Sequence, residues 1–362
     1  MKILIYTESF FPNMGGLERN TFTLASTLMG MGHTPTILTT TEAEKSADRA
    51  NPDAFEKDEY PFQVIRSQTY HTYFSAIRDA DLVFINGGMA LKISLLALVL
   101  RKKYLIIYQN SHLYLRDNNG LLSLMNTAFR KFMANKARFN ITVSQHANDV
   151  LKGLLSNPNI ETLVNPIDAE LEAIAVLKSQ TPTPKVYDIL FAGRIIEGKG
   201  IFILIDALKK VQNAMNLNIA FAGKGDHEAH LLKYAAEKQV NIVYLGRLDR
   251  EQLMDIYAQS KVLVVPSSTH IEGNPLVIAE ALTLGIPIIA SDQPAMIEAV
   301  GNAGYTFKSG NADDLANKIK LLFNGQWTEK QCNTTTRKEE FSYKQYQIRL
   351  NAILQTVITP SV

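Results

Sequence analysis

The chain has 362 residues, of which 46% are hydrophobic and 20% are charged, and its formal net charge is +2. This length and composition predict a folded protein of about two domains, and the near-neutral charge argues against a nucleic-acid binder. A single cysteine, Cys332, excludes an internal disulfide framework and a cysteine-based metal cluster, which fits a reducing compartment.

The first half alternates short apolar runs with helical patterns, the first of which is 17–31. Unbroken Val, Ile and Leu runs are typical of strands buried on both faces, so they predict a parallel sheet with helices between the strands. The N-terminal apolar run is too short for a signal peptide, and no apolar stretch approaches the roughly 20 residues of a membrane span. We therefore expect a cytoplasmic protein. The expected strands are 2–6, 34–40, 62–66, 81–85, 104–108 and 140–144.

The alternation restarts after the proline-containing segment 165–185, and the expected domain boundary lies near 168–185. Several strands of the second set end in Gly or Ser, and small residues there let backbone approach a ligand at the carboxyl edge of a sheet. The expected strands are 187–193, 217–223, 241–246, 262–268 and 286–291, followed by a helix at 343–357. The predicted fold class is α/β, with two facing Rossmann-like, doubly wound domains and a ligand cleft between them. The predicted bounds are 1–168 and 169–341, with 342–362 crossing back to the first domain.

A basic loop follows the first strand of the second set. Arg194 stands directly after Gly193, and Lys199 lies five residues on, where the next helix is expected to begin. Arginine and lysine both suit phosphate oxygens, and a helix N-terminus adds positive potential. The spacing is compatible with phosphate binding and equally with a turn that carries two solvated cations.

Two glutamates, Glu272 and Glu280, stand eight residues apart around an expected helix that begins near Pro275 and ends at Gly285. A helical rise of about 1.5 Å per residue separates them by roughly 12 Å, which matches a diphosphate with a sugar at each end. Glu272 could then bind a transferred sugar and Glu280 a nucleotide ribose. The alternative places Glu272 on the surface and Glu280 at an exposed helix position.

Four segments in order carry a resemblance to a known family. The stretch 272–291, "EGNPLVIAEALTLGIPIIAS", resembles the E-x7-E signature of retaining glycosyltransferases of family four, which have the GT-B architecture. "GRIIEGKG" (193–200) resembles that family's G-R-x3-E-K-G segment, with Gly198 in place of the usual acid. "FFPNMGGLERNTFTLASTLMGMGH" (10–33) and "ITVSQHANDVL" (141–151) are similar to its N-terminal glycine loop and its V-S stretch.

The resemblance implies roles for the matching residues. Arg194 and Lys199 would bind the donor diphosphate, Glu272 the donor sugar and Glu280 the ribose. Backbone at Asn274, Leu276 and Val277 would contact phosphate and sugar. Gly15 and Gly16 would let the first domain's loop approach the phosphate and the acceptor. Gly223 and Arg247 would line the pocket for the base. In family terms the reaction retains the anomeric configuration and needs no metal or other cofactor.

Some positions depart from the family pattern or leave a choice open. The family often has a histidine after the fifth strand, near the sugar's C6 hydroxyl; His112 is our candidate, although a gapless match gives Gln109. Pro275 has no backbone N–H and so removes one possible hydrogen-bond donor to the sugar or phosphate.

Asp79 and Asp81 form a D-A-D motif that could bind metal. The motif precedes its strand, so it is expected at the amino edge of the sheet, away from the expected site.

The function implied is transfer of a hexose, with UDP-glucose as the expected donor, to a glycan or lipid-linked acceptor. The alternatives are a GT-B-like epimerase or phosphorylase and a non-catalytic nucleotide-sugar-binding module.

Two segments of the first half are basic, 101–103 and 129–138, and the second has Phe129, Phe132 and Met133 interleaved. They are compatible with a solvated helix face or with docking on an anionic membrane, which would bring the protein to a lipid-linked acceptor.

Overall fold

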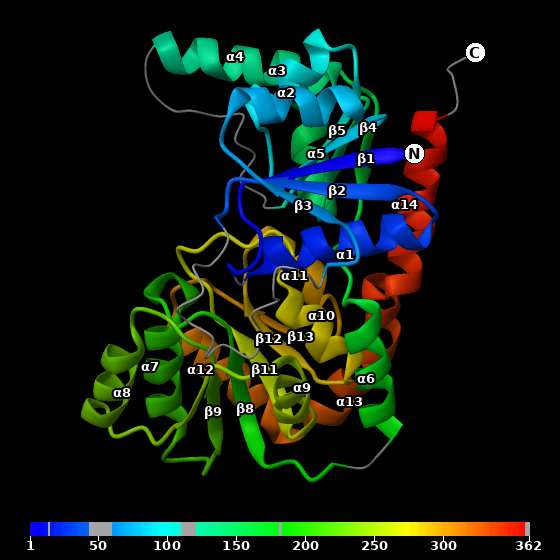
Figure 1. Cartoon of the computed structure of the whole chain (residues 1–362). Coiled ribbons are helices and arrows are strands. Elements are labelled where there is room, and N and C mark those ends of the chain that lie inside the picture. The colour runs from blue at the N-terminus through cyan, green and yellow to red at the C-terminus, as the bar shows by residue number, and fades with distance from the viewer. Residues whose placement is uncertain (14, 43–59, 110–120, 181–182, 359–362) are drawn as a thin grey trace. The chain divides into compact units, whose positions relative to one another are not determined.

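A computed structural model describes residues 1–13, 15–42, 60–109, 121–180 and 183–358. The chain forms two compact units: Met1–Asn165 together with Gln347–Val362, and Pro166–Tyr346. Each unit contains one parallel β-sheet with helices on both faces (Figure 1). Among the described helices, none combines the length and the apolar character needed to cross a bilayer.

The sheet of the first unit has seven parallel strands in the order β3-β2-β1-β4-β5-β6-β7. The strand order reverses beside β1, so the loops after β1 and β4 diverge at the carboxyl edge and leave a place for a ligand. The strands are β1 Lys2–Thr7, β2 Thr34–Thr39, β3 Gln63–Arg66, β4 Leu82–Asn86, β5 Lys103–Tyr108, β6 Phe139–Thr142 and β7 Ile160–Thr162.

Helices cover both faces of this sheet. α2, α3, α4 and α5 pack on one face around a buried apolar cluster, and α1 lies along the other face (Figure 1). Local sequence explains two of the starts: the Thr69 and Ser144 side chains accept N–H groups of the first turns of α2 and α5. The helices are α1 Gly16–Gly30, α2 Tyr70–Asp79, α3 Leu91–Val99, α4 Leu121–Lys136 and α5 Gln145–Lys152.

The sheet of the second unit has six parallel strands in the order β10-β9-β8-β11-β12-β13. Its order reverses between β8 and β11, which are direct neighbours. Their following loops, the basic loop and the loop that carries Glu272, therefore start side by side at the carboxyl edge. The strands are β8 Tyr187–Ala192, β9 Ile219–Ala222, β10 Val243–Gly246, β11 Ser260–Val265, β12 Ile288–Ser291 and β13 Gly304–Phe307.

In the second unit α7, α8 and α12 pack on one face of the sheet around a cluster that includes Phe191, Phe221 and Phe307. Helix α13 packs against α10 and carries the exposed Cys332. The last helix, α14, begins in this unit, and its residues from Gln347 onward belong to the first. The helices are α6 Ala169–Gln180, α7 Ile201–Val211, α8 Glu228–Glu237, α9 Arg250–Ala258, α10 Leu276–Thr283, α11 Pro294–Val300, α12 Ala312–Leu321, α13 Trp327–Lys338 and α14 Tyr343–Ile358.

The structure confirms the α/β class and the two doubly wound sheets, and every strand predicted from sequence is present. It adds two strands that were not predicted, β7 and β13, each at the edge of its sheet. Both are short, with burial that differs from residue to residue, so they lack the continuous apolar run that marks a central strand. The segment 168–185, interpreted as a boundary, contains helix α6.

Candidate active site

Two loops of the second unit pack directly on each other at the carboxyl edge of its sheet. Gly200, with φ +73°, ends the loop after β8, and a Cβ built on it would lie 1.8 Å from the carbonyl oxygen of Pro266, which follows β11. Only glycine combines this left-handed conformation with so close an approach. The residue type at 200 therefore lets the two loops meet.

The basic loop presents two cations at this edge. Arg194 follows β8 and is exposed, and Lys199 closes a short 3-10 helix, Glu197–Lys199, just before α7. The Lys199 side chain is only 18% exposed. The structure therefore places both predicted phosphate ligands at the carboxyl edge, one in solvent and one largely shielded.

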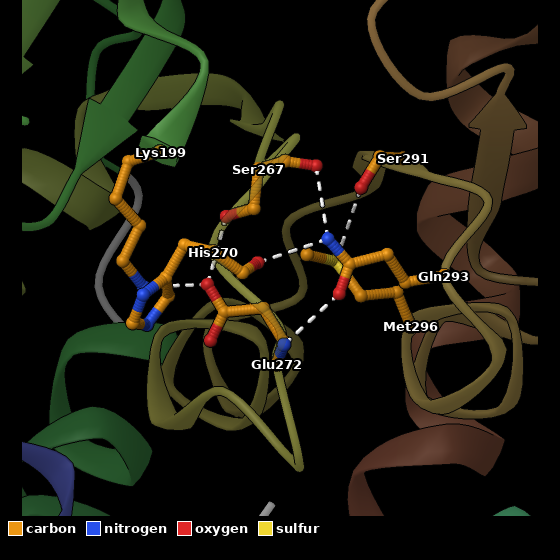
Figure 2. A network of polar contacts seen from close by, with 7 residues as sticks. All are labelled: Lys199, Ser267, His270, Glu272, Ser291, Gln293 and Met296. Atoms are coloured by element: carbon orange, nitrogen blue, oxygen red, sulfur yellow. Dashed lines mark hydrogen bonds and ion pairs between the residues drawn. The ribbon is translucent and has the colours of Figure 1, made fainter. Parts of the chain in front are cut away.

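Lys199 forms an ion pair with Glu272. Its Nζ lies 2.5 Å from Oε1 of Glu272, and the hydroxyl of Ser267 donates to the same oxygen at 2.7 Å (Figure 2). Glu272 is 6% exposed, so it is not the surface residue of the alternative interpretation. A buried carboxylate requires such partners, since an unpaired buried charge costs several kcal/mol.

Two further residues complete this network, and neither was found from the sequence. The amide of Gln293 bonds the backbone at Ser267, His270 and Glu272, and the His270 ring lies next to Lys199 in Figure 2. Burial, and then the positive charges of Lys199 and Arg194, hold the pKa of His270 below its usual value, although Glu272 acts in the opposite direction. His270 is therefore neutral near pH 7.

Helix α10 begins directly after this loop. Pro275 stands at the N-cap with extended backbone, rather than inside the first turn as expected, and Leu276 is the first helical residue. The helix ends as predicted: the N–H of Gly285 bonds the Leu282 carbonyl, and the N–H of Ile286 bonds that of Ala281. Asn274, Leu276 and Val277 thus lie at the start of α10, beside the Lys199–Glu272 pair.

Glu280 lies within α10 and is 3% exposed, so the alternative of an exposed helix position is wrong. The phenol of Tyr257 on α9 donates to Glu280 Oε2 at 3.0 Å. The Glu280 carboxylate, oriented by this phenol, has further lone pairs that could accept hydrogen bonds from the hydroxyls of a ribose.

Gly223 and Arg247 follow β9 and β10. A Cβ on Gly223 would lie 1.8 Å from the Gly193 carbonyl oxygen, so the backbone after β9 touches that after β8. The N–H of Gly223 donates to the Gly246 carbonyl at 2.7 Å, and Arg247, which is exposed, follows directly. The predicted donor-binding residues of the second unit therefore follow the carboxyl ends of its strands, apart from Glu280, which lies in the second turn of α10.

In the first unit, Gly15 and Gly16 stand at the start of α1, at the carboxyl edge of that sheet. Glu18, 7% exposed, folds back over Gly15: a Cβ there would lie 2.7 Å from Glu18 Oε2. The hydroxyl of Ser9, in the loop after β1, donates to Oε1 of Glu18. Glu18, which belongs to the N-terminal glycine segment 10–33, therefore holds the loop after β1 against the start of α1.

His112 lies outside the described residues, but its competitor Gln109 is described. Gln109 Nε2 donates to Asn20 Oδ1 at 2.5 Å and to Asn86 Oδ1 at 2.8 Å, and its Oε1 accepts from Asn165 Nδ2 at 2.9 Å. This amide cluster also includes a direct Asn20–Asn165 bond of 2.6 Å. Both ends of the Gln109 amide are thus engaged within the first unit.

The D-A-D motif has other partners. Asp81 Oδ2 accepts the backbone N–H of Lys2 at 2.8 Å, and Asp79 pairs with the neighbouring Arg78. Within the described part of the chain, no group of three His, Cys, Asp or Glu side chains could hold a metal ion.

Two family profiles match the chain. The one described as Glycosyltransferase Family 4 covers residues 14–171, and the one described as Glycosyl transferases group 1 covers residues 175–339. The first profile contains the glycine loop, and the second contains the basic loop and both glutamates. Each of the four motif segments therefore falls wholly or mostly within a matched region.

Curated relatives are similar at low identity. The sulfoquinovosyl transferase of Arabidopsis thaliana is 27% identical over 160 residues, 43% of this chain and 30% of that protein. The gpi3 subunit of the phosphatidylinositol N-acetylglucosaminyltransferase of Schizosaccharomyces pombe is 22% identical over 358 residues, 92% of this chain and 75% of its own. The match thus spans about 30% of the first relative's length.

Solved structures share the fold of this chain. The crystal structure of HepE from Anabaena in complex with UDP superposes with a TM-score of 0.77 at 19% identity, over 98% of this chain and 100% of that one. Sucrose-phosphate synthase from Thermosynechococcus elongatus superposes with a TM-score of 0.74 at 18% identity, over 98% of both chains. At such identities the likeness shows the fold.

Proposed function

Because this chain belongs to the group 1 glycosyltransferases of family four and has their GT-B fold, we propose that it transfers a hexose from a nucleotide diphosphate sugar with retention of configuration. The acceptor is a glycan or a lipid-linked sugar. Relatives named for sugar transfer to phosphatidylinositol lipids and for amylovoran biosynthesis support this acceptor class. UDP-glucose is the first donor to test.

One observation carries the proposal. Lys199, Arg194 and Glu272 meet where the strand order of the second sheet reverses, which is the position at which open α/β sheets bind ligands. The two cations suit a diphosphate, and Glu272 suits the hydroxyls of a sugar attached to it.

The proposed chemistry is a front-side displacement. The anomeric C–O bond to the diphosphate breaks, the acceptor oxygen bonds the same face, and the acceptor proton passes to the departing phosphate oxygen. Negative charge accumulates on the diphosphate, so the positive charges of Arg194 and Lys199 stabilise the transition state without a metal. Activity should accordingly persist in excess chelator.

Two measurements test the function in sequence. A thermal-shift panel of sugar nucleotides identifies the donor, since a ligand at 100 times its Kd stabilises by about 2.7 kcal/mol. Product analysis with that donor and an acceptor panel then follows. A glycosylated acceptor supports transfer, an isomerised donor indicates an epimerase, and binding without chemistry indicates a binding module.

We also propose that the first unit docks peripherally on an anionic membrane at the cytoplasmic side. Seven large apolar side chains are exposed on α2, α3 and α4, helices that pack in a row on one face of the sheet. Cations lie among them, with Lys92 over the Tyr70 ring and Lys136 over the Phe132 ring, each at 5.5 Å. Met133 is fully buried and does not contribute. The α2–α4 face is defined by Tyr70, Phe74, Leu95, Val99, Met125, Phe129 and Phe132.

A basic cavity adjoins this face and suits lipid phosphates. It has a volume of about 650 Å³ and includes five cations among its lining residues. These cations lie at or just after the carboxyl ends of α3 and α4. The negative end of each helix dipole offsets only about half a charge. The cations are Arg101, Lys102, Lys103, Lys136 and Arg138.

Vesicle co-sedimentation tests the docking. Vesicles with phosphatidylglycerol should carry the protein down, and phosphatidylcholine vesicles should not. Phe132→Ser with Lys131→Glu, both on α4, should reduce binding. Equal binding to both vesicles, or none to either, would contradict this part of the proposal.

A further inference from the structure

Gln293 occupies an unusual position for a long amide side chain. It stands directly before α11, at the N-cap, yet its side chain makes no capping hydrogen bond to that helix. Instead it reaches the loop between β11 and α10, more than twenty residues earlier in the chain (Figure 2). The residue therefore connects the loops that follow two neighbouring strands, β11 and β12.

Three hydrogen bonds fix this contact. Gln293 Nε2 donates to the Ser267 carbonyl at 3.1 Å and to the His270 carbonyl at 3.0 Å, and its Oε1 accepts the N–H of Glu272 at 2.9 Å. Ser267 and Glu272 are buried, so their backbone groups need protein partners. A single amide supplies them along the whole turn from 267 to 272.

The same turn is held from its other side by the basic loop. The Gly198 carbonyl accepts the N–H groups of Ser268 at 2.9 Å and His270 at 3.1 Å. A Cβ on Gly198 would lie 3.1 Å from Thr269 Oγ1, a tight contact, so the glycine at this position lets the two loops approach without displacing that side chain. Gln293 and Gly198 thus hold the turn between them.

From this geometry we propose that Gln293 is a positioning residue for the donor sugar. It sets the backbone of Glu272, and through it the carboxylate that pairs with Lys199. This inference rests on the proposed function of Glu272 as the sugar contact. The amide acts through Glu272 and need not touch the substrate itself.

The chemistry of the three contacts selects glutamine. The turn offers one N–H and two carbonyls, so its partner must supply one acceptor and two donors, which a carboxamide does. A methionine has similar length but no such donors. A glutamate would direct charged oxygens at two carbonyls, and only its protonated form would restore one donor.

Binding measurements on the full chain test this role. For Gln293→Met we expect a loss of about 10-fold or more in affinity for UDP-glucose, with affinity for UDP changed less than about twofold, because the lost bonds support the sugar contact. Transfer should show a lower kcat/KM for the donor and an unchanged acceptor KM. The matched control, Asn333→Leu, removes an amide-to-carbonyl bond of 3.1 Å to Asn302 on the same unit and should change neither affinity.

Gln293→Glu adds a readout that a purely structural defect would not show. Its activity relative to wild type should rise as the pH falls toward the range where the new carboxyl protonates, although Glu272, Lys199, Arg194 and His270 lie nearby and shift that range. A constant ratio of activities across pH, or donor affinities of the Met variant within twofold of wild type, would overturn the proposal.

Amide hydrogen exchange separates this inference from the proposed function. Faster exchange at 267–272 in Gln293→Met, but not in Asn333→Leu, is expected whether or not UDP-glucose is the donor. If wild type binds no sugar nucleotide, the proposed function is wrong, and the role of Gln293 in sugar placement falls with it. If wild type binds donor but exchange is unchanged, only the role of Gln293 is wrong.

Discussion

Lys199 and Glu272 form a largely buried ion pair and also have proposed roles in donor binding, and substitutions can separate the structural from the chemical contribution. Lys199→Met should lower turnover about 100- to 1,000-fold, as for loss of one group that stabilises transition-state charge. It should also lower the free energy of unfolding by up to about 3 kcal/mol, because Glu272 is buried and loses its cation.

Adding Glu272→Gln to Lys199→Met should recover part of that stability, since no buried charge is then left without its partner. Turnover should stay low, because the diphosphate still lacks Lys199. Urea unfolding and steady-state kinetics on wild type, Lys199→Met, Glu272→Gln and the double variant provide the comparison. Recovery of turnover in the double variant would show that Lys199 acts only as a structural partner.

His270 should make stability depend on pH. Its pKa is lower in the folded protein than its usual value of about 6.5, so the folded state resists protonation while the unfolded state accepts it. The stability that this group contributes is present above about pH 6.5 and is lost as the pH falls through the folded pKa.

Urea unfolding between about pH 8 and pH 5 measures this effect. His270→Gln removes the titrating group. The unfolding free energy of wild type should therefore fall relative to that of the variant as the pH drops below about 6.5. A difference that stays constant with pH would mean that burial does not perturb this imidazole.

The residues of the site differ in how far sequence could reveal them. Arg194, Lys199, Glu272 and Glu280 stand in motifs whose local spacing is informative. The structure places the first three at one edge of one sheet and Glu280 in α10, the helix that begins there. Gln293 carries no such signal, because its partners are 21 to 26 residues away and are backbone groups. A side chain that binds backbone at long range can be identified only from the folded chain.

At the scale of elements, the contact between the basic loop and the strand end of β11 depends on Gly200. Gly200→Ala should destabilise the protein and lower donor affinity, since its Cβ would collide with the Pro266 carbonyl at a φ that only glycine adopts readily. Gly310→Ala is the control: φ is +79° there, but no atom lies within 4 Å of the added Cβ.

The control should therefore cost only the backbone strain, about 1 kcal/mol, whereas Gly200→Ala adds the steric clash. Thermal unfolding and UDP affinity distinguish the two. Equal effects of the two variants would mean that the loops separate without cost.

Elements were predicted well where their pattern was continuous. Central strands such as β4 and β5 are nearly or wholly buried along their length and read as unbroken apolar runs. The edge strands β7 and β13 pair on one side only, so selection for apolar residues is weaker there and sequence did not reveal them. Helix α6 was not predicted, because the prolines near its ends led to the interpretation of this segment as a domain boundary.

At the scale of the whole molecule, charge is distributed unevenly. Residues 82–148 contain nine Lys or Arg against one Asp, an excess of +8, whereas the full chain carries +2 and the remainder therefore −6. Vesicle binding should accordingly fall steeply with salt, since the screening length drops from about 10 Å at 0.1 M to about 3 Å at 1 M. Sedimentation across this salt range measures it, and salt-independent binding would contradict an electrostatic attachment.

The lone thiol offers a practical route into these questions. Cys332 is exposed on α13, and α13 packs against α10, the helix that carries Glu280. A maleimide dye would attach there at one defined place without prior mutagenesis. Fluorescence from that dye would then report in real time on whether sugar nucleotides perturb α10, without a label on any of the proposed site residues.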